Sequence, residues 1–576
     1  CYMAGNRKAW NGRRREREMK EEVRSYLSRS LCDAVTEAFP EIGLTPAQVV
    51  VEKPKNPSFG DISSPLPVSL ARTLKRPPAE IARRLMDSFR WDRSFIEPDP
   101  ELGRTVRGGF LNFKLSREYL DDLLGRLVKA PEDFGRNQVR EPHSILLEFV
   151  SANPTGPMVV VNARAAAVGD VTARLHEWIG NSVKREYYVN DYGRQIKLLG
   201  ASLAARYLQS KGKAATVPEG GYEGEYVTEL TQRIVRECPE VEVLEESDLG
   251  EFFQTRALEY NLIDQRRILS AYGVEYDTWF RESILHREGQ TDAVVDILGK
   301  KGLVYEADGA RWFRSSGFGD EKDRVMVRGD GEPTYFLADI AYHVAKAERG
   351  FDESYTFWGP DHHGYLPRLE AAVEALELRK PLFKNFIIQQ VNLIRDGRPY
   401  LMSKRRGEIV TMSDLIDQVG VDAARYFFLM RRLSSHFDFD MDLAVRRSED
   451  NPVYYVQYAH ARTCNVLLHA AARGYSPEAI AGAQPDALDQ PEELEILKIA
   501  AEFPHIVRLA AETVEPRKLT SYAEIVAAAF HQFYQKHRIV TDDAPRTKAR
   551  LLLTTAVRNL LRTTLGLLGV TAPERM

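Results

Sequence analysis

The stretch ILLEFVSANPTGPMVVVNARAAAVGD, residues 145–170, decides how the rest of the chain is interpreted. It opens with a short apolar run holding one acid, Glu148, breaks into a Pro- and Gly-containing loop, and continues as a predicted helix ending near Gly180. A buried strand, a tight loop and a helix start present free backbone N–H groups and the positive end of a helix dipole. The stretch is therefore a candidate site for an anionic ligand, although many such units serve only as scaffold.

The composition is that of an ordinary globular protein with more than one domain. A chain of 576 residues is expected to form about two to four domains. Its net charge of -4 gives no global attraction to nucleic acid, so RNA contacts would have to come from local patches. The four cysteines are far apart, which argues against a disulfide framework or a zinc site and suits a reducing cytosol. No apolar run approaches the ~18 residues of a transmembrane helix, so no membrane partner is expected.

The first part of the chain predicts a small α+β domain. Residues 1–18 carry six Lys or Arg against two Glu and are interpreted as a basic N-terminal extension without a structural role. Residues 19–118 show helical spacing at their start, a strand at 48–54, a helix pair within 67–89 and a closing strand. Five basic residues would suit a basic face, with a solvated surface an equally good interpretation: Lys53, Lys55, Arg72, Lys75 and Arg76.

Residues 119–445 predict an α/β domain with a parallel, Rossmann-like sheet. Strands expected at 145–150, 183–189, 354–358 and 385–394 alternate with helices, one of them starting at Asp361. Ligands of such sheets lie at the carboxyl ends of the strands. A polar section at about 205–330, with a predicted strand pair in its last part, is interpreted as an insertion.

After about residue 445 only helical patterns remain. Four long periodic segments, one of them at 492–512, predict that residues 446–576 form an all-α bundle. Basic and aromatic side chains alternate on its third segment: His531, Tyr534, Lys536, His537 and Arg538. Such a pattern can bind RNA, but taken alone an amphipathic surface is the stronger interpretation.

Three further groups of residues lie where an α/β domain would hold a ligand. Tyr335 and Asp339 are one helical turn apart and share a face. A second group, Gly359, Asp361 and His362, follows a predicted strand. The third, Met402, Ser403 and Lys404, belongs to a basic loop that ends in a glycine. A cationic loop in that place can clamp a polyphosphate.

The order of these blocks resembles that of the class I aminoacyl-tRNA synthetases, and the residues within the blocks resemble those of the arginyl-tRNA synthetases. SANPTGP is similar to that family's lead-in to its His-Ile-Gly-His signature, and TYFLADIAYH, WGPDHHGY, MSKRRG and GVDAARYFF are similar to its later blocks. FGDISSPLPVSLAR and GGFLNFKL resemble its N-terminal additional domain, and LGVTAPERM the end of its helical anticodon-binding domain. The resemblance covers residues 19–576 and implies tRNA-binding domains at 19–118 and 446–576 around a catalytic domain.

The resemblance also implies a reaction and a set of site residues. The expected reaction is ATP-dependent activation of L-arginine and its transfer to tRNA(Arg), with Mg²⁺ on the phosphates. Independently of the resemblance, a cytoplasmic protein is expected from the cysteines, and a monomer because the sequence shows no coiled coil or oligomerising repeat. Four residues are expected to bind arginine: Glu148, Asn153, Tyr335 and Asp339. Eight are expected at ATP: Pro157, Val159, Gly359, Asp361, His362, Met402, Ser403 and Lys404. Acids suit such a substrate because a planar guanidinium forms bidentate hydrogen bonds with carboxylates.

The signature itself departs from the family pattern. Where the family has His-Val-Gly-His, this chain has Val159-Val160-Val161-Asn162, and Leu401 replaces the first lysine of the second signature. Loss of one donor to a developing oxyanion typically costs ~10²–10³ in rate. Two interpretations therefore remain open: a ligase in which Asn162 and Lys404 are the catalytic groups, and a paralogue that binds tRNA or arginine without forming the adenylate.

Overall fold

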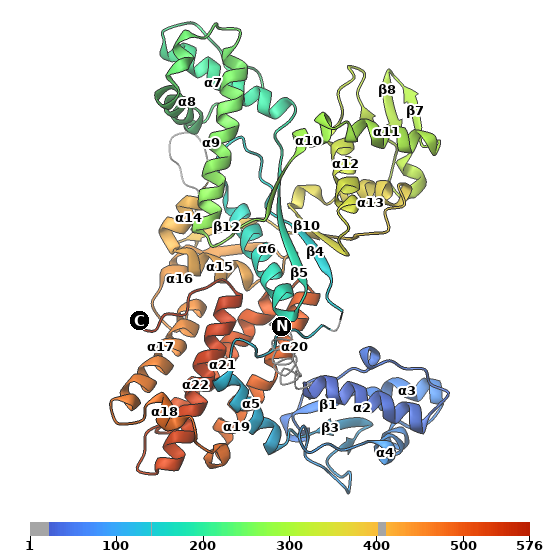
Figure 1. Cartoon of the computed structure of the whole chain (residues 1–576), viewed down its shortest axis with the longest axis vertical. Helices are drawn as coiled ribbons and strands as arrows, with labels where there is room; N and C mark the ends of the chain where they lie inside the picture. Colours follow the sequence, from blue (N-terminus) through green and yellow to red (C-terminus); the bar gives the residue numbers. More distant parts are fainter. Residues whose placement is uncertain (1–21, 140, 401–409) are drawn as a thin grey trace, which may run out of the picture. The chain divides into compact units, whose positions relative to one another are not determined.

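The chain, seen here in a computed structural model, forms two compact units. The structure describes residues 22–139, 141–400 and 410–576 (Figure 1). One unit comprises residues 1–134, 463–505 and 528–560, and the other residues 135–462, 506–527 and 561–576. The boundary passes through four helices: α17 (Pro452–Ala471), α20 (Phe503–Glu512), α21 (Arg517–Lys536) and α22 (Ala544–Leu567).

The first unit starts with the predicted small α+β domain. A three-stranded antiparallel sheet in the order β1-β3-β2 is formed by β1 (Ile62–Ser64), β2 (Val106–Arg107) and β3 (Phe110–Phe113). Its helices are α2 (Val23–Ala38), α3 (Leu66–Leu74), α4 (Pro78–Ser88) and α5 (Arg117–Lys129), and α18 (Pro477–Ile480) and α19 (Pro491–Ala501) belong to the same unit. The strand expected at 48–54 is wrong, because that segment contributes only an isolated bridge between Glu52 and Ser63.

A five-stranded parallel sheet in the order β11-β10-β4-β5-β6 forms the centre of the second unit (Figure 1). Its strands are β4 (Ser144–Glu148), β5 (Ser182–Val189), β6 (Thr278–Arg281), β10 (Glu353–Trp358) and β11 (Leu382–Ile387). The chain adds β5 and β6 on one side of β4 and β10 and β11 on the other. This reversal confirms the Rossmann-like fold and marks the carboxyl ends of β4 and β10 as the ligand-binding crevice.

Helices cover this sheet and form a lobe beside it. They are α6 (Val160–Ile179), α7 (Arg194–Ser210), α8 (Glu225–Glu237), α9 (Leu249–Ala271), α10 (Glu282–Arg287), α11 (Gln290–Lys300), α12 (Tyr335–Glu348), α13 (Leu366–Ala375), α14 (Met412–Val419), α15 (Val421–Leu429) and α16 (Met441–Val445). Helices α7, α8 and α9 share a separate apolar core around Leu203, Ile234 and Phe253 (Figure 1). In the described part of the chain no helix is long and apolar enough to cross a membrane.

Two small sheets complete the second unit. An antiparallel sheet is formed by β7 (Val304–Ala307), β8 (Ala310–Phe313) and β9 (Arg324–Val327), and a mixed one by β12 (Val391–Arg395), β13 (Arg398–Pro399) and β14 (Phe437–Asp440). The pairing of β8 with β9 confirms the predicted strand pair. The section 205–330 is interrupted by β6, which pairs with β5 in the central sheet.

Three predicted elements are each divided in the structure. The expected strand at 385–394 is the end of β11 and the start of β12, which belong to different sheets. The helix expected from Asp361 begins at Leu366, after a short 3₁₀ turn at Pro360–His362. The segment 492–512 is two helices, α19 and α20; Pro504 lacks the backbone N–H that a continuous helix would need there.

Candidate active site

The loop after β4 turns sharply as it leaves the sheet. Val150 and Ser151 have φ angles of 70° and 41°, in the left-handed region that side-chain-bearing residues rarely adopt. Such strain persists only where the surroundings hold it in place, and it concentrates at functional sites. Behind the loop, a Cβ on Gly169 would lie 2.2 Å from the Phe149 ring, so only glycine lets α6 pack this closely on β4.

Side chains from β5, α9 and the segment just after it hold the carbonyl groups of this loop. Tyr276 Oη donates to the carbonyl of Phe149 over 3.1 Å, and Tyr187 Oη donates to that of Ala152 over 3.0 Å. Gln265 Nε2 donates to the Asn153 carbonyl over 3.3 Å, and Asn261 Nδ2 to the Pro154 carbonyl over 2.8 Å. Tyr187, Gln265 and Asn261 are buried. These contacts fix the position of the loop that carries Asn153.

Glu148 lies at the end of β4 and already has a cationic partner. Its Oε2 is 2.7 Å from Nζ of Lys346, which is fully buried, and its Oε1 accepts from the Ser151 hydroxyl over 3.2 Å. The positive charge of Lys346 offsets the negative charge of Glu148, because burying either charge without the other would cost much free energy. The expected pairing of Glu148 with a substrate cation therefore has a competitor that the sequence did not reveal.

Asp339 is the fifth residue of α12, one turn after Tyr335, and is half-buried. The Tyr365 hydroxyl donates to its carboxylate. Burial raises the pKa of Asp339 to about 7, and the nearby charges of Glu282 and Glu148 add to this effect while the Tyr365 hydrogen bond and Lys346 oppose it. A cation placed beside this carboxyl would stabilise its ionised form.

Glu282 is a third acid of this group and is not among the site residues predicted from the sequence. It is 3% exposed, at the first residue of α10, directly after β6. Its charge also raises the pKa of Tyr335 and Tyr192, although burial is the larger cause for both. The signal that could have found it is an acid at the end of a strand of the parallel sheet, which is also where the structure has Glu148.

Tyr335 and Asn153 complete the predicted arginine-binding set. Tyr335 is the first residue of α12 and is 43% exposed. Asn153 is exposed, and its side-chain amide lies 3.3 Å from that of Asn190. When the amides of Asn190 and Asn153 are both turned, the Asn190 oxygen accepts from Asn153 over 3.3 Å and its nitrogen donates to Glu282 over 3.1 Å. Asn190 thus connects Asn153 with the acid group.

The start of α6 differs from a free anion-binding helix end. Asn162 Oδ1 accepts from the backbone N–H of Val159 over 2.8 Å, so the side chain caps its own helix and leaves its NH₂ group as the donor. Val159 forms an antiparallel bridge with Thr411, and the backbone N–H of Met412 donates to the Met158 carbonyl over 2.8 Å. Pro157, in the preceding loop, is exposed.

The residues expected at adenosine lie at the end of β10, next to β4 in the sheet. Gly359 follows the strand, and Asp361 and His362 are exposed in the short turn after it. The His362 ring lies 6.1 Å from that of Tyr365, the residue that binds Asp339. The expected phosphate loop with Met402, Ser403 and Lys404 lies outside the described residues.

Three family models match successive parts of the chain. Residues 21–115 match the arginyl tRNA synthetase N terminal domain, residues 127–428 the class I (R) tRNA synthetase catalytic domain, and residues 456–576 the DALR anticodon binding domain.

Relatives and solved structures match over most of the chain. The arginine–tRNA ligase of Symbiobacterium thermophilum is 41% identical over 559 residues, covering 96% of this chain and 99% of its own. That of Bacillus subtilis is 42% identical over 530 residues, covering 92% and 94%. The crystal structure of a putative arginyl-tRNA synthetase from Campylobacter jejuni aligns with a TM-score of 0.74 at 33% identity, covering 80% of this chain and all of its own. The Thermus thermophilus arginyl-tRNA synthetase shares the fold, with a TM-score of 0.75 at 23% identity, covering 96% and 100%. The chain belongs to the arginyl-tRNA synthetase family of class I aminoacyl-tRNA synthetases.

Proposed function

We propose that this chain activates L-arginine with ATP and transfers the arginyl group to tRNA(Arg). The observation that carries the proposal is the group of three acids, Glu148, Glu282 and Asp339, gathered at the carboxyl end of the sheet. Glu148 is paired with Lys346, and the His286 ring lies 3.4 Å from Glu282, but neither Glu282 nor Asp339 is bonded to a lysine or arginine among the described residues. The group therefore keeps a negative charge that a guanidinium would neutralise.

The arginine side chain would lie between Asp339 and Glu282, with Tyr335 beside the guanidinium. Asn153 would meet the α-amino end, because the buried donors of α9 hold its backbone in place. Asp339 gives up its proton in this complex, since a cation next to it stabilises the charged form. A pocket built for several N–H donors also rejects amino acids that lack them.

Adenylate formation would take place at the start of α6. The arginine carboxylate attacks the α-phosphate of ATP and pyrophosphate leaves, a step in which the protein supplies positioning and charge. The Asn162 NH₂ group is free to donate there, because its Oδ1 is bound to Val159. Pro157, Val159, Gly359, Asp361 and His362 would surround the nucleotide, and Met402, Ser403 and Lys404 would reach its phosphates. Mg²⁺ would be carried on those phosphates rather than in a site of its own.

Two regions would bind the tRNA, residues 19–118 and 446–576. Within the first, the proposed basic face is exposed: Lys53, Lys55, Arg72, Lys75 and Arg76. Within the second, Lys536 and His537 contact Glu492 over 2.6 and 3.0 Å, so this carboxylate already neutralises part of the positive charge that could bind RNA. Tyr534 is 42% exposed and is the better candidate for stacking on a base. We further propose a cytoplasmic location and a monomeric state, and sedimentation of the pure protein tests the monomeric state.

Aminoacylation of tRNA with labelled amino acid tests the proposed function. Labelled arginine should be incorporated and labelled lysine should not. The Asp339→Asn variant keeps the size of the side chain but loses its charge, and it should lose incorporation at low arginine concentration. Incorporation of lysine as efficient as that of arginine, or an unchanged Asp339→Asn variant, would contradict the assignment.

A further inference from the structure

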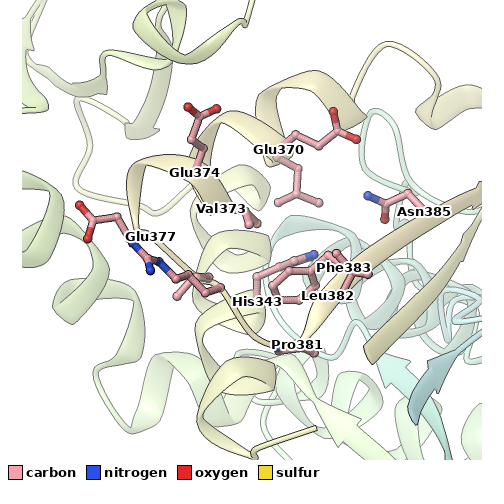
Figure 2. Close-up of a pocket in the computed structure, with 12 residues that line it drawn as sticks. His343, Glu370, Val373, Glu374, Glu377, Pro381, Leu382, Phe383 and Asn385 are labelled. Atoms are coloured by element: carbon pink, nitrogen blue, oxygen red, sulfur yellow. The ribbon is translucent and has the colours of Figure 1, made fainter. Parts of the chain in front are cut away.

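A second pocket lies between α12, α13 and β11, and none of its lining residues belongs to the candidate active site (Figure 2). Its volume is 470 Å³, within the roughly 300–1,000 Å³ of small-ligand sites. Part of its lining is apolar: Leu369, Val373, Leu378, Pro381, Leu382 and Phe383. Leu382 is 56% exposed although it starts a strand of the central sheet. The pocket therefore offers apolar surface to an occupant.

His343 contributes to this pocket an acceptor that has no hydrogen-bond partner among the described residues. The residue is 2% exposed, and its Nδ1 lies 2.8 Å from the carbonyl oxygen of Asp339. A carbonyl can only accept, so Nδ1 is the donor and Nε2 of the neutral ring keeps its lone pair. Within the described residues Nε2 has no hydrogen-bond partner. Burial lowers the pKa of His343 to about 3, which keeps the ring neutral at physiological pH.

Carboxylates from α13 and the loop after it form one side of the pocket (Figure 2). Glu377 is 3.1 Å from Lys301, but Glu370 and Glu374 have no ion-pair partner in the part of the chain that the structure describes. Arg379 is the cation among the lining residues. The lining thus holds three carboxylates, one of them paired with Lys301, against one guanidinium, so the pocket presents mainly acceptors with a net negative charge.

We propose that this pocket binds an amphipathic organic cation, meaning an ammonium or amidinium group on an apolar body. The cationic N–H groups would donate to His343 Nε2 and to the carboxylates of Glu370 and Glu374, while the apolar body covers Val373 and Phe383. An anion would be repelled by the two carboxylates. A neutral apolar molecule would cover the Nε2 acceptor of His343 without supplying a donor, which costs binding free energy.

Two side chains of the pocket connect it to the candidate active site. His343 donates to the carbonyl of Asp339, and Asn385 accepts a 2.9 Å hydrogen bond from the indole N–H of Trp358, which precedes Gly359. An occupant that moves either side chain acts directly on the elements proposed to hold arginine and adenosine. Occupancy should therefore change the dissociation constant of arginine by about fivefold or more. This second step rests on the proposed function, whereas binding in the pocket does not.

Calorimetry with 2-phenylethylammonium on the full chain tests the binding step. Saturating L-arginine keeps the probe out of the acid group of the active site. We expect one-site binding, and much weaker binding of the neutral 2-phenylethanol. The double variant Glu370→Gln and Glu374→Gln should weaken the probe about tenfold or more, because charge-assisted hydrogen bonds are lost. Glu348→Gln, an exposed glutamate at the end of α12, is the matched control and should bind the probe normally.

His343→Phe supplies an independent check, with thermal unfolding measured beside it to establish that the variant folds. It keeps a ring in the pocket but removes the acceptor, and should weaken the probe to a similar extent. No binding by the parent, equal binding by the parent and the double variant, or equal binding of ammonium and alcohol would each overturn the proposal. A chain that binds the probe but not arginine would contradict the proposed function alone.

Discussion

At the scale of single residues, the proposed arginine site depends on the charges of three buried or half-buried acids, Glu148, Glu282 and Asp339. Glu148 was predicted from the sequence because an isolated acid in an apolar strand is conspicuous. Its partner Lys346 was not predicted, because 198 positions separate the two and Lys346 looks like an ordinary helix residue. Glu282 was not predicted as a site residue, because the strand before it is only four residues long and lies in a polar section. Ion pairs between residues that are distant in the sequence can therefore be identified only from the structure.

Arginine affinity should depend on pH through Asp339. Its pKa is about 7 in the ligand-free protein, so the carboxyl is mostly protonated at pH 6 and mostly ionised at pH 8. Because only the ionised form pairs with the guanidinium, the dissociation constant should fall about tenfold over this interval. Without arginine, the same raised pKa makes the free energy of unfolding decrease as the pH rises from about 4 to about 7.

Calorimetric titrations at several pH values would measure this dependence. Below pH 7 arginine binding should release a proton, which appears as a dependence of the heat on the buffer. The Asp339→Asn variant should bind weakly at every pH. A dissociation constant that does not change with pH in the parent would show that arginine binding does not deprotonate Asp339.

At the scale of elements, α9 positions the loop between β4 and α6. Asn261→Asp is nearly isosteric but cannot donate its hydrogen bond to the Pro154 carbonyl when ionised. An unsatisfied buried carbonyl costs about 1–3 kcal/mol, so kcat/KM for arginine should fall about tenfold or more, chiefly through a higher KM. The exposed Thr255→Ala on the same helix is the control. Equal kinetics for both variants would show that α9 has no positioning role.

The contact between β4 and α6 gives a test of packing. Gly169→Ala would place a methyl group 2.2 Å from the Phe149 ring, and overpacking of this kind costs about 1–3 kcal/mol. Gly299→Ala on α11 meets nothing within 4 Å and should instead stabilise by about 0.4–1 kcal/mol. Chemical denaturation of both variants measures the difference, and equal stabilities would contradict the close approach of β4 and α6.

At the scale of the whole molecule, the order of elements was largely predictable. Alternating strands and helices indicated the parallel sheet, and helical periodicity indicated the all-α C-terminal part. The division between β11 and β12 was not predictable, because the residues between them, Ile388-Gln389-Gln390, contain no glycine or proline to mark a turn. The donors of α9 could not be predicted either, since they bind carbonyls more than 100 positions away.

The central claim is that the chain forms arginyl-adenylate although Val159-Val160-Val161-Asn162 replaces the usual signature. Arginine-dependent ATP–pyrophosphate exchange, measured with tRNA present, tests it most directly. The comparison is with a variant carrying Val159→His, Val161→Gly and Asn162→His. The parent should give exchange that requires arginine, and the restored variant a faster rate. No exchange by the parent beside strong exchange by the restored variant would contradict the claim and identify a chain that binds its substrates without activating them.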